Sequence, residues 1–294
     1  MEQNEGQQDP ESDVVTPFAE LKEAYFPAAV VALPHITRLI EVFSMAPAEA
    51  LTEATKAGQV DWVQNLLGRF GFDISEALVE AASKGDSAIA GLLMDTLVGA
   101  EDVQQDVVWA IERSGEAAAQ NGHLRAAELF SHEIRYYCRS LMPTLDMLNA
   151  AAAYGHLDVV KFVIEQAEQG GFVDEYCRFP TSDTLSRAIT GGHPDVVEFL
   201  LTHENLRWNL KEAFLAAMNQ REHAVAERIY TMYPQQHPGK DLFIELALYG
   251  CKEAADYLYS NVCHKDPSAV NKALESATAG NQTCVVEFLL DIIA

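Results

Sequence analysis

The sequence has few basic residues for its size. Among its 294 residues, 20 are lysine or arginine and 44 are aspartate or glutamate, so the formal net charge is −24. A protein that binds DNA or RNA needs cationic side chains to neutralise phosphates, and this balance therefore predicts no nucleic-acid partner. The same acidic excess disfavours anionic membrane surfaces and favours a protein partner that carries basic residues.

The sequence also lacks the cysteine patterns of disulfide frameworks and zinc ribbons. Its five cysteines are scattered and include no CxxC pair, which predicts a reducing compartment, the cytoplasm, with the nucleus as the alternative. No basic segment followed by an apolar one opens the chain. No apolar run approaches the roughly 18 residues of a membrane-spanning helix. We therefore expect no association with a membrane.

Motifs of catalysis are missing as well. The sequence contains no GxSxG elbow, HExxH zinc motif, GxxxxGK[ST] phosphate loop or GxGxxG dinucleotide motif. Cys263 and His264 are adjacent, but no residue pattern around them indicates a nucleophile and its base. The many carboxylates are spread along predicted helix faces, which favours a solvated surface. The sequence therefore predicts a protein that is not an enzyme and has no catalytic residue, cofactor or metal.

What the sequence does contain is one pattern repeated along most of its length. An alanine-rich segment leads to a glycine, a few polar residues follow, and small apolar residues then precede an aromatic residue or leucine. The clearest copies are AAAYGHLDVVKFV from Ala151 and AITGGHPDVVEFLL from Ala188. Eight copies align at the glycine, which is an arginine in one of them. The equivalent positions are Gly58, Gly85, Gly122, Gly155, Gly192, Arg221, Gly250 and Gly280.

The spacing of the copies indicates a helical repeat. Successive copies are 27 to 37 residues apart, which lies among the periods of helix–turn–helix repeats. The alanine-rich half has good helix propensity, and in the second half Leu157, Val160 and Val163 recur at helical spacing. The glycine stands where the chain must reverse, in a left-handed backbone that costs other residues about 1–2 kcal/mol. We therefore expect Arg221 either to carry this strain or to form a different turn.

These copies resemble the second half of an ankyrin repeat, with its A-A-x-x-G-H-x-x-V-V-x-x-L-L signature. The similarity is close at Gly155, Gly192 and Gly280 and extends from about Leu51 to residue 294. The TPLH opening of that family, which caps the first helix and holds the hairpins, is absent, so the chain is similar to divergent ankyrin repeats. The resemblance implies an all-α solenoid of about eight helix–turn–helix units. It also implies a non-catalytic scaffold that binds a protein partner through its concave groove and inter-repeat loops.

The composition divides the chain into three parts. Residues 1–16 are rich in glutamine, glutamate and aspartate and predict a disordered acidic tail. Residues 17–50 predict a helical segment that caps the array of residues 51–294. Within residues 26–46, the stretch FPAAVVALPHITRLIEVFSMA faintly resembles the start of an F-box. This resemblance leaves open an alternative function as a substrate adaptor of a ubiquitin ligase.

Aromatic and basic residues gather between the predicted helices. Tyrosine, tryptophan and arginine are enriched at binding hot spots because they combine a large contact area with a polar end. The competing interpretation is that they cover the edges of the core, and the sequence leaves both open. The predicted partner-binding residues are Arg135, Tyr136, Tyr137, Arg139, Tyr176, Arg178 and Trp208.

Three histidines, His123, His156 and His193, follow the repeat glycine. Equivalent positions on packed helices lie about 8–10 Å apart, which is too far for the three side chains to share a metal ion. We therefore expect each histidine to hydrogen-bond across the turn at the start of its second helix. Ankyrin repeats also carry histidine at this position.

The last copy ends in CVVEFLLDIIA, an apolar helix without a polar cap after it. Terminal repeats need a polar outer face to remain soluble. The sequence therefore predicts either self-association through the C-terminal repeat or an array that continues in a longer protein.

Overall fold

The computed structural model of the chain describes residues 46–69, 73–97, 105–137, 142–169, 183–203, 208–236, 241–262 and 267–294. Within these ranges the regular elements are sixteen helices, which confirms the predicted all-α class. The helices form eight consecutive pairs. These are α3 (Pro47–Lys56) with α4 (Val60–Leu67), α5 (Ser75–Lys84) with α6 (Ser87–Asp95), α7 (Gln105–Gln120) with α8 (Leu124–Tyr137), α9 (Met142–Ala153) with α10 (Leu157–Gln169), α11 (Thr184–Gly191) with α12 (Pro194–Thr202), α13 (Leu210–Asn219) with α14 (His223–Gln236), α15 (Leu242–Leu248) with α16 (Lys252–Asn261), and α17 (Pro267–Ala279) with α18 (Thr283–Ile293).

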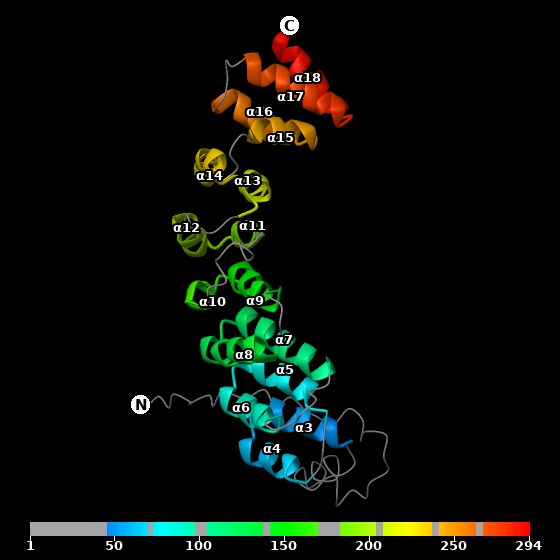
Figure 1. Ribbon diagram of the computed structural model, residues 1–294, viewed down its shortest axis with the longest axis vertical. Coiled ribbons are helices and arrows are strands. Elements are labelled where there is room, and N and C mark those ends of the chain that lie inside the picture. The colour runs from blue at the N-terminus through cyan, green and yellow to red at the C-terminus, as the bar shows by residue number, and fades with distance from the viewer. Residues whose placement is uncertain are drawn as a thin grey trace, which may run out of the picture.

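The pairs follow one another along the long axis of the molecule (Figure 1). From α3 to α13, the first helix of each pair packs against the first helix of the next, and α15 packs against α17 in the same way. Second helices contact each other similarly from α4 to α12 and between α16 and α18. Each pair therefore buries its apolar face largely against its neighbours in the sequence.

Polar and aromatic contacts connect α14 with the pair that follows it. The Tyr233 hydroxyl donates a hydrogen bond to Glu245 of α15, and the Tyr257 hydroxyl of α16 donates to Glu227 over 3.1 Å. The ring of His223 stacks on that of Tyr257 with 5.0 Å between the centroids. These contacts continue the stack across the boundary between α14 and α15.

Small side chains allow the first helices to approach closely. The repeat position four residues before the turn carries alanine in all pairs except that of α15, where it carries Leu246. Because the alanine side chain is small, it places no bulky group between neighbouring helices. The residues at this position, all 0% exposed, are Ala54, Ala81, Ala118, Ala151, Ala188, Ala217, Leu246 and Ala277.

The two helices of every pair are joined by the same turn. At Gly155, φ is 81°, the glycine amide donates to the carbonyl of Ala152, and the His156 amide donates to that of Ala151 over 2.9 Å. This pair of bonds is the Schellman motif, which ends a helix on a left-handed residue. The residues with positive φ at the eight turns are Gly58, Gly85, Gly122, Gly155, Gly192, Arg221, Gly250 and Asn281.

Two of these turns settle expectations from the sequence. Arg221 has φ 62°, so it adopts the strained left-handed backbone. The prediction of Gly280 as the turn residue of the last pair is wrong, because Asn281 has φ 57° and takes that position. Asparagine tolerates the left-handed region better than most residues. Gly280 serves a different purpose, since a Cβ there would lie 2.4 Å from the carbonyl oxygen of Leu248.

The predicted boundary of the repeat array falls inside a helix. Helix α3 runs from Pro47 to Lys56, so residues 47–50 belong to the first helix of the first pair. The acidic tail, most of the predicted capping segment and almost all of the F-box-like stretch lie in residues 1–45, outside the described residues.

Candidate functional site

Side chains from one helix pair bind the turn of the pair before it. In each of the three repeat histidines, the Nε2 atom lies near a backbone carbonyl in the last turn of the first helix of the preceding pair. The carbonyls of a helix's last turn have no hydrogen-bond partner within the helix. Because a carbonyl oxygen only accepts, the Nε2–H donates. The bonds are His123 to Ser83 (3.1 Å), His156 to Gln120 (2.9 Å) and His193 to Ala153 (3.0 Å). The histidines therefore connect neighbouring pairs, and the expectation that each ties its own turn is corrected.

The histidine rings also explain why glycine occupies the turns they cover. A Cβ on Gly85, Gly122 or Gly155 would lie 2.4 to 2.5 Å from an atom of the next pair's histidine ring. Glycine is thus required twice at these turns, for the positive φ and for the space that the ring fills. We call this contact of a histidine on the preceding glycine the glycine–histidine contact.

The series of three glycine–histidine contacts ends at the turn between α13 and α14. Arg221 stands there in place of the glycine and Glu222 in place of the histidine. Apart from Gly192 and its neighbours in the chain, no atom of the described residues lies within 4 Å of the position that a Cβ on Gly192 would take. One link between the pairs persists, because Gln220 Nε2 donates to the Thr190 carbonyl over 3.3 Å. The space that a ring fills at the preceding turns is open here.

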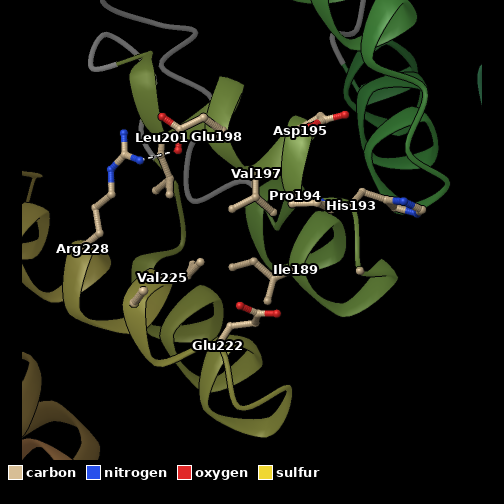
Figure 2. Close-up of a pocket in the computed structure, with 12 residues that line it drawn as sticks. Ile189, His193, Pro194, Asp195, Val197, Glu198, Leu201, Glu222, Val225 and Arg228 are labelled. Atoms are coloured by element: carbon tan, nitrogen blue, oxygen red, sulfur yellow. Dashed lines mark hydrogen bonds and ion pairs between the residues drawn. The ribbon is translucent and has the colours of Figure 1, made fainter.

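A hollow of about 650 Å³ lies at this interface, between α12 and α14 (Figure 2). We call it the α12–α14 groove. Its floor is apolar and includes Ile189, Val197, Leu201 and Val225. Val197 is 6% exposed, whereas the residue at the same repeat position is 0% exposed in every other pair up to α15–α16. Those covered residues are Val63, Ala90, Ala127, Val160, Ala226 and Ala255.

The rim of the groove is acidic. Figure 2 shows Ile189 and Val197 between Glu222 on one side and the Arg228–Glu198 ion pair on the other. The Arg228 guanidinium lies 2.5 Å from the Glu198 carboxylate, so these two charges offset each other. Asp195 and Glu222 also line the groove, and neither forms an ion pair within the described ranges. The groove therefore combines an apolar floor with two unpaired carboxylates.

A second hollow, of about 540 Å³, is lined by α3, α5 and α7 and the residues preceding α5. Its most prominent side chain is Trp109, which is 56% exposed. The Arg113 guanidinium carbon lies 4.7 Å from the centroid of a Trp109 ring, within the range of a cation–π contact. We call this feature the Trp109 hollow. It presents a large aromatic surface on the first helices, in a setting that also contains the carboxylates of Asp73, Glu76, Glu80 and Asp106.

No protein-family model and no curated protein matches the chain. The geometry of the two hollows and of the exposed aromatic residues is therefore the basis for a functional assignment. No helix in the described part of the chain is both long and apolar enough to cross a membrane.

Three of the predicted binding residues lie in the last turn of α8, where a connector was expected. Arg135 donates a hydrogen bond to Gln166 of α10, which ties two second helices together. The rings of Tyr136 and Tyr137 meet edge to face with 4.8 Å between their centroids. Burial raises the pKa of the Tyr137 phenol above its usual value. Tyr136 is 76% exposed and is the member of this group most available to a partner.

Trp208 does not fit its predicted role in partner binding. Its side chain is 0% exposed, and the indole N–H donates to the Leu200 carbonyl over 3.2 Å. The large ring thus fills the core while its one polar atom is satisfied internally. Arg139, Tyr176 and Arg178 lie outside the described residues.

Reactive and metal-binding groups contribute little to the surfaces that the structure describes. Burial raises the pKa of the Cys251 thiol, which disfavours the nucleophilic thiolate at neutral pH. The described residues contain no group of three or more histidine, cysteine, aspartate or glutamate side chains placed to hold a metal ion.

Sequence reasoning missed the Trp109 hollow and the α12–α14 groove. Trp109 lies on the same helix face as Arg113, Glu116 and Gln120, which are polar and exposed. This spacing in the sequence indicates that Trp109 is exposed as well. The groove also has a signal in the sequence, because Arg221-Glu222 follows three successive Gly-His turns and lacks both residues.

Proposed function

We propose that the protein is a non-catalytic scaffold of ankyrin-like repeats that binds a protein partner through side chains exposed on its stacked helices. The repeated A-A-x-x-G-H sequence and the recurrence of one turn geometry in eight helix pairs support the ankyrin-like assignment. Neighbouring repeats that bury their apolar faces only against each other form extended surfaces, which such proteins use for binding.

The observation that carries this proposal is the exposure of Trp109. An indole that is 56% exposed leaves a large apolar surface in contact with water, and burying that surface against a partner is favourable. Arg113 lies over the ring and adds donors next to it. Tryptophan and arginine are the residue types most enriched at binding hot spots. The Trp109 hollow is therefore the part of the described surface best suited to a protein partner.

A photocrosslinking amino acid at position 109 tests this function in cells that express the protein. We expect one or a few proteins to be captured there, and we expect the same probe in place of Glu253, which is exposed on α16, to capture none of them. Identical captures at both positions, or none at position 109, would count against the scaffold function.

Replacing Trp109 with alanine is expected to weaken binding of a captured partner about tenfold or more, as at hot spots, with no loss of thermal stability. Tyr136→Ala is the parallel variant for the predicted surface on α8. Titration calorimetry with the purified partner measures both effects. If binding is unchanged in both variants, the contact surface lies elsewhere on the protein.

Two other expectations remain proposals. The ubiquitin-ligase adaptor would depend on residues 26–46, and co-purification of a ligase scaffold that is lost on deleting them would support it. Self-association through the C-terminal repeat would involve Leu290 and Ile293 of α18, each 50% exposed. A mass of one chain in sedimentation equilibrium would exclude it.

A further inference from the structure

We propose that the α12–α14 groove is a docking site for a peptide segment of a partner protein, in which an apolar side chain lies close to a lysine or arginine. This inference rests on the scaffold function and adds to it a second surface and the chemistry of its occupant. The groove is on the second helices, whereas the Trp109 hollow is on the first helices.

The floor of the groove defines the apolar part of the occupant. Val197 and Ile189 are covered less completely than the residues at the same repeat positions in the three preceding pairs. At this interface Glu222 stands in place of the histidine whose ring would lie over Gly192. A volume of about 650 Å³ falls in the range of pockets that bind ligands. An aliphatic or aromatic side chain placed here would fill the space that a histidine ring takes at the three preceding turns.

The rim defines the basic part of the occupant. Glu198 is already neutralised by Arg228, whereas Asp195 and Glu222 have no ion pair within the described residues and lie next to the apolar floor. A lysine or arginine near the apolar side chain would reach one of these carboxylates. The net charge of −24 adds a long-range attraction for a basic segment and speeds its encounter with the groove.

The same charges argue against other occupants. A second copy of the chain would bring another net charge of −24 to an acidic rim, and an anionic ligand would face Asp195 and Glu222. A basic and apolar peptide is the occupant that satisfies both the floor and the rim.

Arrays of short synthetic peptides test the proposal with the full chain as the probe. One array places leucine or phenylalanine at varied distances from lysine or arginine. A second replaces the basic residues with glutamate, and a third replaces the apolar residues with serine. We expect the full chain to bind a subset of the first array and none of the others. The proposal is overturned if nothing in the first array binds, or if a control array binds equally well.

The variant Glu222→His links that binding to the groove. It introduces the residue of the three preceding turns, so its ring should cover Gly192, donate to the Thr190 carbonyl and raise the melting temperature. Because the histidine ring would occupy part of the groove, we expect the affinity for the selected peptides to fall about tenfold or more, as on loss of a hot-spot contact. Glu275→His, which makes the same change in charge at an exposed position on α17, should leave binding unchanged.

The outcomes separate this inference from the scaffold function. Unchanged peptide binding in a folded Glu222→His variant would overturn the docking site, while capture at position 109 would still support the scaffold. A concentration-dependent dimer that is abolished by Glu222→His would identify a second copy as the occupant and would also overturn the proposal. An unfolded Glu222→His variant would contradict the histidine-like geometry on which the proposal depends.

Discussion

Replacing Val160 with aspartate is expected to unfold the middle of the helix stack. Val160 lies in α10 and is 0% exposed, at the repeat position where the second helix faces the core. A carboxylate placed there without a partner costs several kcal/mol, in either its charged or its protonated form. Since domains of this kind are stable by about 5–15 kcal/mol, one such change removes a large part of the total. Thermal melts followed by circular dichroism at a helical wavelength measure the loss.

The matched control is an aspartate on the exposed side of the same helix. Glu165 is exposed, and Glu165→Asp should change stability by no more than about 0.5 kcal/mol, as surface substitutions do. If Val160→Asp melts like the unsubstituted protein, residue 160 does not lie in a repeat interface.

Replacing Gly155 with alanine is expected to destabilise the protein by about 2–5 kcal/mol. Two costs add at this turn. A residue with a Cβ loses about 1–2 kcal/mol in the left-handed backbone, here at φ 81°. The Cβ would also lie 2.4 Å from Nδ1 of His193, and overpacking of this kind costs about 1–3 kcal/mol. Urea unfolding of the purified variant gives the free energy directly.

Gly192→Ala isolates the first of these costs. Gly192 has φ 73°, but no atom of the described residues beyond its own neighbours in the chain lies within 4 Å of the Cβ that alanine would add. We therefore expect a loss of about 1–2 kcal/mol, from the backbone alone. Equal losses at the two glycines would show that the His193 ring adds nothing at Gly155.

The class of the fold and most of its turns were predictable because they follow from local chemistry. Glycine at a helix end and alanine four residues before it recur every 27 to 37 residues. The conformational preferences of these residues act within one pair of helices. Of the two alternatives that the sequence left open for Arg221, its positive φ shows the strained left-handed turn. The error at Gly280 arose because asparagine also tolerates the left-handed region, so the sequence Gly280-Asn281 allows two alignments of the repeat.

Contacts between pairs were harder to predict, because sequence spacing does not say which neighbour a side chain reaches. His156 follows its own turn in the sequence, yet it bonds to Gln120 of the preceding pair. Tryptophan is a residue type that is enriched at hot spots, and only the packing of the core shows that Trp208 is buried. The same limit applies to the α12–α14 groove. The substitution at Glu222 is visible in the sequence, but the gap over Gly192 appears only when the stacked pairs are placed side by side.

The central claim is that His123, His156 and His193 are packed onto the glycine of the pair before them, and that the groove lies at the next interface, where Glu222 takes the place of the histidine. A double-mutant cycle on Gly155 and His193 tests it most directly. His193→Ala removes the ring and should relieve the steric part of the Gly155→Ala penalty. The double variant should therefore lose less free energy of unfolding than the two single variants lose together. We expect a difference of about 1 kcal/mol or more, as for residues in contact. Losses that add to within about 0.3 kcal/mol would show that the two residues do not interact and would contradict the account.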